Sequence, residues 1–369
     1  MTEGAAAPSD LFGEMRAGGH EQVAFCHDPS SGLRAIIAIW STALGPSLGG
    51  CRFQPYPTEA AALADVLRLS RAMGLKNAAA GLDLGGGKAV IIGDPRADKT
   101  EARLRAFGRF VDSLGGRYLT AEDVGTTQAD MDMIRRETPY VTGVSARRGG
   151  SGDPSPVTAR GVAEAMRAAA EFAWGTGDLA GRHVAVQGVG KVGGALARIL
   201  SVEGARITVA DVDGAAADRL ATELGSEVVP PEKVHAVECD VLAPCALGGV
   251  ITDATVPELH CRVVCGAANN QLGSDAMAAE LQRRDIVYVP DFVANAGGVI
   301  NIAVELEGYD PELARERVAA IRATTSALLT RARSESVTSL DAAMALAFDR
   351  IDSVSRLSRI RTTRVRRTR

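Results

Sequence analysis

The sequence predicts an α/β fold of two domains: an N-terminal α/β domain and then a doubly wound parallel sheet, with a cleft between them. The chain has 369 residues, more than a single hydrophobic core usually serves. From about residue 183 onward, nearly continuous apolar runs alternate with helical patterns, which is typical of a parallel sheet covered on both faces. A glycine-rich turn follows the first of those runs.

Composition narrows the class of protein. Apolar residues make up 46% of the chain, charged residues 23%, and the formal net charge is −4, so we expect a globular protein with no nucleic-acid partner. No apolar run is long enough to cross a membrane, and the N-terminus lacks the pattern of a signal peptide. The six cysteines form no CxxC pair, so we expect buried thiols in a cytoplasmic protein, without disulfides or a metal site.

The first half of the chain is predicted to contain both strands and helices. Alternating and apolar runs indicate strands, apolar residues at helical spacing indicate helices, and Thr58 has the side chain of a helix N-cap. Residues 85–88 are interpreted as a glycine loop that runs into a strand. The expected elements are a hairpin at 22–40 with its turn at Asp28-Pro29, a helix after Thr58, a strand at 89–92, a helix at 101–114 and a short strand at 118–120.

A stretch rich in arginine, glycine, serine and proline at 147–156 indicates the crossing between domains. A long helix is expected at 157–173, and a helix at about 311–333 is expected to lead the chain back. The expected domains are 1–146 for substrate, catalysis and oligomerisation, 147–335 for the dinucleotide, and a C-terminal segment, 336–369, that returns to the first domain. The basic end of that segment is interpreted as a solvated or disordered tail, with a weak polyanion contact as the alternative.

The glycine-rich turn of the second half has the context of a Rossmann dinucleotide site. The strand at 183–186 precedes it and a helix at 195–200 follows. Gly188 permits the tight turn, Gly190 lets backbone N–H groups approach phosphates, and Gly193 lets helix and strand pack closely. The cofactor-binding turn is therefore expected at Gly188, Val189, Gly190, Lys191, Val192 and Gly193.

Asp211 ends the next strand and predicts the choice of cofactor. Its carboxylate would accept hydrogen bonds from the ribose hydroxyls and repel a 2′-phosphate, so NAD is favoured over NADP. FAD, or glycines that serve packing alone, remain alternatives.

Lys88 follows three consecutive glycines. The stretch is not a phosphate-binding P-loop, because Leu82 and Ala89 occupy positions that require Gly and Ser or Thr. We interpret the loop as one that lets substrate approach backbone and that positions Lys88 as a general base, with Lys76 12 residues upstream as a second cation. The alternative for each is an ordinary surface lysine. Asp123, after the strand at 118–120, is the candidate carboxylate, with an ordinary helix cap as its alternative.

These segments together resemble the glutamate/leucine/phenylalanine/valine dehydrogenase family, with the strongest likeness to its valine and leucine dehydrogenases. The resemblance runs from about residue 20 to about residue 335. The motifs are LGPSLGG (44–50), GLKNAAAGLDLGGGKAVIIGDP (74–95), TAEDVGT (120–126), GDPSPVTARGV (152–162), QGVGKVG (187–193), APCALGG (243–249), GAANNQL (266–272) and PDFVANAGGVIN (290–301).

The resemblance implies a role for each site residue. Lys76 would bind the substrate α-carboxylate, Lys88 would activate water and polarise the imine or carbonyl, and Asp123 would shuttle the amino-group proton. The further contacts implied are Gly49, Gly50 and Asn295 with the substrate, and Thr158 and Asn269 with the nicotinamide end of the cofactor.

The resemblance also implies a substrate class. In glutamate dehydrogenases a lysine precedes the paired glycines and holds the side-chain carboxylate, whereas Leu48 stands there in this chain, so glutamate should be rejected. The remaining apolar wall would be Ala121, Val299 and Ile302. The implied reaction is the reversible NAD-dependent deamination of branched-chain L-amino acids by a homo-oligomer, a dimer or an octamer. Alternatives are a phenylalanine dehydrogenase, a catalytically silent NAD-binding regulatory protein, and a pyridoxal enzyme with Lys88 as Schiff base.

Two features depart from the family pattern. Cys51 stands where the family commonly has Thr, and the arginine-rich tail does not resemble a family ending. We expect the first to have little effect, and the second leaves the oligomeric state open.

Overall fold

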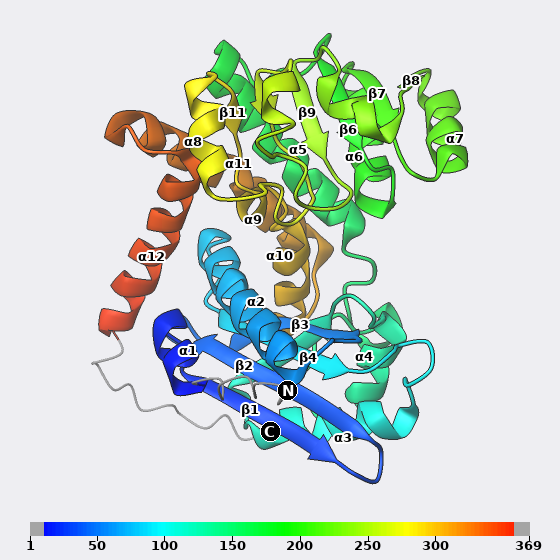
Figure 1. Ribbon diagram of the computed structural model, residues 1–369, viewed down its shortest axis with the longest axis vertical. Coiled ribbons are helices and arrows are strands. Elements are labelled where there is room, and N and C mark those ends of the chain that lie inside the picture. The colour runs from blue at the N-terminus through cyan, green and yellow to red at the C-terminus, as the bar shows by residue number, and fades with distance from the viewer. Residues whose placement is uncertain (1–10, 358–369) are drawn as a thin grey trace, which may run out of the picture. The chain divides into compact units, whose positions relative to one another are not determined.

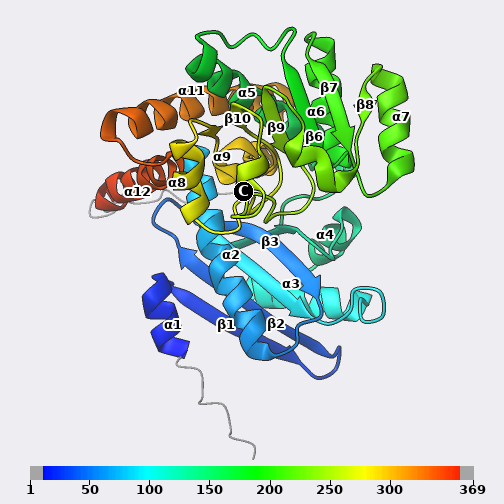
Figure 2. The ribbon, with the colours of Figure 1, turned by 45° about the horizontal axis from the view of Figure 1, so that its top comes forward.

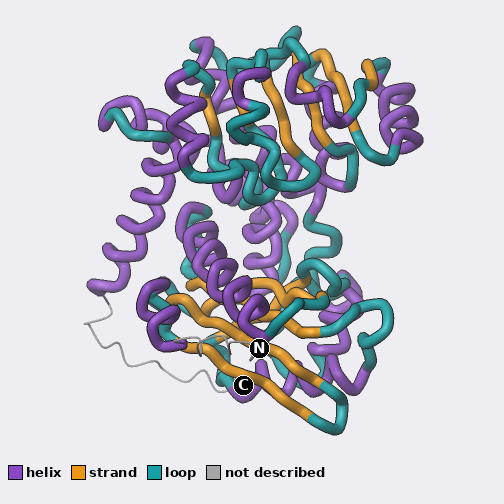
Figure 3. The backbone as a smooth tube through the Cα atoms, viewed as in Figure 1, coloured by secondary structure: helices purple, strands orange, loops and turns teal. Residues whose placement is uncertain are grey.

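The structure, a computed structural model, describes residues 11–357. Residues 11–150 and 348–357 form one compact unit and residues 151–347 form a second, and the strands of Figure 3 fall into two sheets accordingly. The first ten residues of the N-terminal stretch, which was expected to lack a signal pattern, lie outside the described residues. All but the first two residues of the expected basic tail, 356–369, also lie outside.

The first unit contains a five-stranded mixed sheet with the strand order β1-β2-β4-β3-β5 (Figure 1). β1 and β2 form the predicted antiparallel hairpin, β2 is antiparallel to β4, and β3 is parallel to both β4 and β5. The strands are β1 (Gln22–Asp28), β2 (Leu33–Ser41), β3 (Ser47–Gln54), β4 (Gly85–Ile92) and β5 (Tyr118–Glu122).

Helices cover both faces of this sheet, because alternate residues of each strand point to opposite sides. Helix α2 (Glu59–Ala79) packs on the face that carries Ala38 and Val90. Helices α3 (Glu101–Ser113) and α4 (Gln128–Ile134) pack on the opposite face. The hydroxyl of Thr58 accepts a hydrogen bond from the N–H of Ala61 at 3.1 Å, which confirms the predicted cap of α2. A short helix, α1 (Leu11–Gly18), precedes the sheet.

The glycine run was predicted wrongly as a loop. Gly85, Gly86 and Gly87 are the first three residues of β4 and are buried. A Cβ on Gly86 would lie 2.5 Å from the carbonyl oxygen of Ser70 and 2.7 Å from the Cα of Gly74, both in α2. A Cβ on Gly87 would lie 2.7 Å from the ring of Tyr118. These glycines let a helix and a ring pack directly on the strand, so they do not form an open path for substrate.

The second unit has a six-stranded sheet, and all of its strand pairs are parallel. The spatial order β11-β10-β9-β6-β7-β8 places the first strand in the middle and extends the sheet in both directions, which confirms the doubly wound parallel sheet (Figure 2). The strands are β6 (His183–Gln187), β7 (Arg206–Ala210), β8 (Glu227–Val228), β9 (Val241–Pro244), β10 (Val263–Val264) and β11 (Val287–Tyr288).

Helices connect these strands and lead the chain onward. The α-helices are α5 (Ser155–Trp174), α6 (Lys191–Val202), α7 (Gly214–Leu224), α8 (Ala276–Arg283), α9 (Asp291–Ala294), α10 (Gly297–Val304) and α11 (Pro311–Glu335). Within residues 11–357, 3-10 turns lie at Ala146–Arg148 in the first unit and at Pro231–Ala236, Val256–Glu258 and Glu305–Glu307 in the second. Helix α12 (Ser339–Leu357) ends in the first unit, where the ring of Phe348 meets that of Trp40 edge-on at 6.4 Å. Among the described residues, no helix is long and apolar enough to span a membrane.

The packing of α2 on β4 predicts the effect of a single added methyl group. We expect Gly86→Ala to lower the free energy of unfolding by about 1–3 kcal/mol, because the new Cβ meets helix backbone that has no alternative rotamer. Thermal unfolding of this variant and of Gly214→Ala measures the effect. Gly214 is a matched control, since a Cβ there meets nothing within 4 Å. Equal stability of the two variants would contradict this account of the glycine run.

Candidate active site

The candidate site of the first unit lies on the sheet face that α2 covers. Lys88 is paired with Ala38 and stands two residues before Val90, so its side chain shares the face of those two core residues. In β3, Leu48 pairs with Gly86 of β4, and Gly50 pairs with Ala121 of β5. The sheet therefore brings four predicted site residues onto one face. They are Leu48, Gly50, Lys88 and Ala121.

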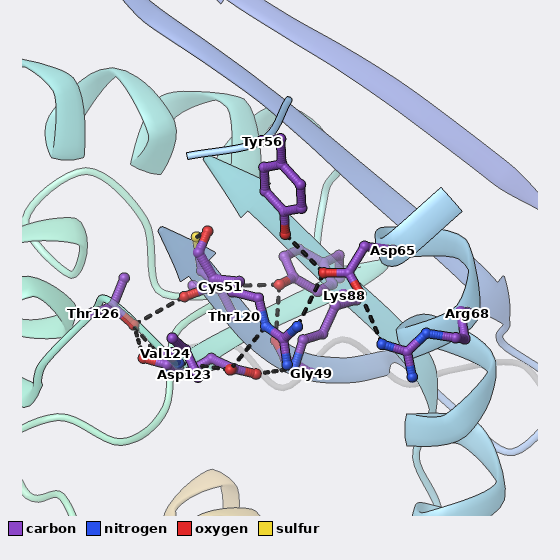
Figure 4. Close-up of polar contacts among 12 residues, drawn as sticks. Gly49, Cys51, Tyr56, Asp65, Arg68, Lys88, Thr120, Asp123, Val124 and Thr126 are labelled. Atoms are coloured by element: carbon purple, nitrogen blue, oxygen red, sulfur yellow. Dashed lines mark hydrogen bonds and ion pairs between the residues drawn. The ribbon is translucent and has the colours of Figure 1, made fainter. Parts of the chain in front are cut away.

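Lys88 and Asp123 form an ion pair that is largely removed from solvent (Figure 4). Only 5% of the Lys88 side chain and 16% of the Asp123 side chain are exposed, so the alternative of a surface lysine is wrong for Lys88. Asp123 follows β5 directly, and its Oδ1 accepts the N–H of Val124 at 2.6 Å. The cap of α4 is Thr127, so the alternative of a helix cap is wrong for Asp123.

The pKa of the Asp123 carboxyl is lowered from its ordinary value. Burial raises this pKa, but the positive charge and hydrogen bond of Lys88, the charge of Arg52 and the N–H of Val124 together outweigh that effect. Asp123 is therefore held as a carboxylate beside a buried ammonium group. Such a pair can pass a proton between its two members and a bound amine or water.

Sequence reasoning missed Arg52, which contacts the other oxygen of Asp123. Its Nε lies 3.4 Å from Asp123 Oδ1, and its Nη1 lies 3.0 Å from Asp65 Oδ2 on α2. The signal that could have found it is the alternation of β3, because Arg52 stands two residues after Gly50 and so shares the site face.

The paired glycines have packing reasons of their own. A Cβ on Gly50 would lie 2.8 Å from the Cβ of Asp123 and 3.0 Å from its Oδ2, and a Cβ on Gly49 would collide with the carbonyl oxygen of Gly87. Cys51 points into the core on the opposite face, and burial raises its thiol pKa well above the ordinary value. This departure from the family pattern therefore lies away from the site. Lys76 is half-buried on α2, and its role toward substrate stays a prediction.

The dinucleotide turn of the second unit has the expected local geometry. Gly188 directly follows β6 and has a φ of +93°, which favours glycine, and a Cβ on Gly193 would collide with the carbonyl oxygen of Gly188. A Cβ on Gly190 would meet nothing within 4 Å, so its backbone is open to a ligand. Asp211 Oδ2 accepts the N–H of Val189 at 2.7 Å, which sets this carboxylate beside the turn. These residues fit a dinucleotide whose phosphates lie at the start of α6.

The remaining predicted site residues, some for the cofactor and some for the substrate, fall within the second unit. Asn295 Nδ2 donates to Asn269 Oδ1 at 2.9 Å, which brings two of them into contact. The buried Oδ1 of Asn295 has no hydrogen-bond partner in the described part of the chain, as expected of an atom that faces a ligand. Thr158 lies in the first turn of α5 and would contact a Cβ on Gly298 of α10. The remaining predicted residues are Lys191, paired with Asp153 at 3.2 Å, Val192 on α6, and Val299 and Ile302 on α10.

Within residues 11–357, no group of three or more His, Cys, Asp or Glu side chains is arranged to hold a metal ion. All six cysteines are free thiols.

The Lys88–Asp123 pair predicts a pattern of stabilities. We expect Asp123→Asn to lower the free energy of unfolding by about 3–5 kcal/mol at neutral pH, because it leaves the Lys88 charge buried without its partner. The double variant Lys88→Met/Asp123→Asn should recover most of that loss. The lowered pKa of Asp123 means that its charge stabilises the fold above an unfolded pKa near 3.9. The difference in free energy of unfolding between the wild type and Asp123→Asn should thus shrink as the pH falls below about 4.

Thermal unfolding of the single and double variants between pH 3 and pH 8 measures this pattern. A double variant less stable than both single variants would contradict the pairing.

Comparisons with known proteins agree with this arrangement. Residues 20–140 match the dimerisation domain of the Glu/Leu/Phe/Val dehydrogenases, and residues 149–222 and 216–358 match the glutamate/leucine/phenylalanine/valine dehydrogenase family. The chain is 51% identical over 345 residues to a leucine dehydrogenase of Geobacillus stearothermophilus, covering 94% of each chain. It is 52% identical over 337 residues to a valine dehydrogenase of Streptomyces virginiae, covering 90% of this chain and 94% of the relative.

A solved structure shares the fold and much of the sequence. The crystal structure of L-tryptophan dehydrogenase from Nostoc punctiforme matches with a TM-score of 0.84 and 44% identity, over 94% of this chain and 99% of that one. The two matched domains cover most of the chain, and the parallel sheet is of the kind that binds a nicotinamide cofactor. This chain is therefore an amino acid dehydrogenase and belongs to the glutamate/leucine/phenylalanine/valine dehydrogenase family.

Proposed function

We propose that this protein catalyses the reversible, NAD-dependent oxidative deamination of the branched-chain L-amino acids valine, leucine and isoleucine to 2-oxo acids and ammonia. The observation that carries the proposal is the buried Lys88–Asp123 pair, in a chain about half identical to leucine and valine dehydrogenases. A buried pair of charges costs free energy unless it is well compensated, and proton transfer to an amine gives it a use.

Each residue of the first unit has a defined task in this proposal. Lys76 binds the α-carboxylate and so orients the α-carbon. The nicotinamide ring, when bound, supplies the acceptor for the hydride that leaves that carbon. Asp123 takes up a proton from the substrate amine and returns it to the nitrogen that leaves as ammonia. Lys88 activates the water that adds to the C=N bond and polarises the carbonyl as ammonia leaves. Gly49 and Gly50 line the proposed substrate pocket through their backbone.

The substrate class follows from apolar side chains at the proposed pocket. Leu48 is fully buried and carries no charge that could compensate a side-chain carboxylate, so we propose that glutamate is rejected. Ala121 lies on the same sheet face as Leu48, and the resemblance to the family proposes Val299 and Ile302 of α10 as further apolar contacts of the substrate. The branched side chains of Val299 and Ile302 would leave less room for the substrate than small side chains would. This favours valine, leucine and isoleucine over phenylalanine as substrates.

NAD is the proposed cofactor because of Asp211. Its carboxylate follows β7 and accepts the N–H of Val189 in the glycine turn and the N–H of Asp213. A negative charge at this place accepts the ribose hydroxyls of NAD and repels the 2′-phosphate of NADP.

We further propose a cytoplasmic homo-oligomer, a dimer or an octamer. The family description of the first matched domain as a dimerisation domain supports self-association. The six free thiols are compatible with a reducing compartment.

A spectrophotometric assay tests the proposal. Purified protein is given L-valine, L-leucine, L-isoleucine, L-phenylalanine, L-tryptophan and L-glutamate, each with NAD and with NADP, and NADH or NADPH formation is followed at alkaline pH. The proposal predicts fast turnover of an aliphatic substrate with NAD. Preference for an aromatic substrate would overturn the substrate class, and binding of NADH without turnover of any amino acid would favour a silent cofactor-binding protein.

The side chain at position 48 predicts a change of specificity. We expect Leu48→Lys to lower kcat/KM for valine on the order of 10-fold or more, because a charged amine then faces an aliphatic side chain. Leu48→Met keeps an apolar side chain of similar size and serves as the control. A single thermal unfolding transition and a far-UV circular dichroism spectrum like those of the wild type show that each variant is folded. Unchanged valine kinetics in folded Leu48→Lys would place Leu48 outside the pocket.

A further inference from the structure

Arg52 lies between two carboxylates that come from different elements. Its Nε is 3.4 Å from Asp123 Oδ1, and its Nη1 is 3.0 Å from Asp65 Oδ2. About 21% of the arginine side chain is exposed, against 16% for Asp123 and 15% for Asp65, so all three are mostly shielded from solvent. The guanidinium is planar and rigid, so two fixed carboxylates determine its orientation.

Asp65 is itself anchored on both of its oxygens. Its Oδ2 accepts the hydroxyl of Tyr56 at 2.8 Å as well as Arg52 Nη1, and its Oδ1 accepts Arg68 Nη2 at 2.8 Å (Figure 4). This arrangement ties the end of Arg52 to helix α2 and leaves its Nε aimed at Asp123. Asp65 and Tyr56 therefore support Arg52 from the side away from Asp123.

The two oxygens of Asp123 have different partners. Oδ2 pairs with Lys88, whereas Oδ1 receives Arg52 Nε and the N–H of Val124. Rotation of the carboxylate would break all of these contacts together. Arg52 and the N–H of Val124 hold Oδ1 and so leave Oδ2 to face Lys88, and neither group needs to touch the substrate.

We infer that Arg52 is a positioning residue for Asp123, which holds the carboxylate with Oδ2 toward Lys88, and that Asp65 on α2 holds Arg52 in place. The inference rests on the proposed function, since the proton-shuttle role of Asp123 is part of that proposal. It assigns the reaction a third cation besides Lys88 and Lys76, one that acts on the acid–base carboxylate and leaves the substrate carboxylate to Lys76.

The charges around Asp123 fix the sign of the expected effects. Arg52 is a permanent cation, so replacing it with a neutral residue should raise the pKa of Asp123. Asp65 partly offsets that cation, so Asp65→Asn should lower the pKa of Asp123. The other groups near the carboxylate are Lys88 on β4, Cys51 on β3 and Tyr118 on β5. Helix α2 carries the cations Lys76 and Arg68, and Glu122 directly precedes Asp123 in the chain. Burial raises the pKa of the Cys51 thiol and of the Tyr118 phenol well above ordinary values, so both stay neutral.

Steady-state kinetics with L-leucine and NAD test the positioning role. We expect Arg52→Gln to lower kcat on the order of 10- to 100-fold while KM for leucine changes far less, because the carboxylate is displaced and the binding groups are not. Arg52→Lys should recover part of kcat, since lysine keeps the positive charge but lacks the planar set of N–H donors of the guanidinium. The matched control is Arg105→Gln, which removes another arginine of this unit that pairs with two carboxylates, Glu101 at 2.8 Å and Glu137 at 2.6 Å.

A second measurement reads the carboxylate directly and needs no turnover. Carbon-13 NMR of protein labelled at the aspartate carboxyls follows the titration of Asp123, which is assigned by its loss in Asp123→Asn. The carboxyl should titrate at higher pH in Arg52→Gln and at lower pH in Asp65→Asn than in the wild type, and it should be unchanged in Arg105→Gln. A purely structural role would not give shifts of opposite sign.

The two measurements separate the two proposals. If the wild type turns over no amino acid, the proposed function fails, and the carboxyl titrations still decide whether Arg52 acts on Asp123. If the wild type is active, and neither kcat nor the titration changes in Arg52→Gln, the positioning role is wrong. An equal loss of kcat in Arg105→Gln would also overturn it, because the effect would then be general destabilisation.

Discussion

The ion pair between Lys88 and Asp123 is the interaction on which the rest of the first unit depends. Two opposite charges removed from water are tolerated only when each is held close to the other and has further hydrogen-bond partners. The sheet meets this demand through its register, because Lys88 on β4 and the end of β5, where Asp123 begins the loop, lie on either side of β3. Arg52 and the N–H of Val124 complete the shell around the carboxylate. The geometry is therefore rigid before any substrate arrives, as acid–base chemistry requires.

Glycines allow the close packing that holds this geometry. Gly86 brings the backbone of α2 onto β4, and Gly50 brings β3 against Asp123. Close packing of this kind places the helix that carries Lys76 and Asp65 directly over the strands that carry Lys88 and Arg52. In the second unit, glycines act at the turn itself. Gly188 adopts a positive φ and Gly190 leaves its backbone open, whereas Gly193 lets α6 pack against the carbonyl oxygen of Gly188.

Much of this could be predicted from the sequence, and the failures share one cause. The parallel sheet, the hairpin and the Thr58 cap were predicted because local patterns determine them, and the structure confirms each. The glycine turn after β6 has the expected positive φ and close packing, and its binding of a dinucleotide stays a prediction. The glycine run before Lys88 was misread as a loop, because consecutive glycines in a sequence do not reveal a helix backbone that packs on them. Arg52 was missed for a related reason: its partners Asp65 and Asp123 are 13 and 71 residues away in the chain. Contacts of that range follow from the fold and from no local motif.

The central claim is that the buried pair carries out the deamination, and a single-turnover experiment with L-leucine deuterated at the α-carbon tests it most directly. The wild type and the double variant Lys88→Met/Asp123→Asn are each mixed with NAD, and deuterium in the nicotinamide ring and free ammonia are measured. The account predicts one equivalent of each from the wild type and neither from the double variant, although the variant still folds and binds NADH. Transfer of deuterium at the wild-type rate by the folded double variant would contradict the account.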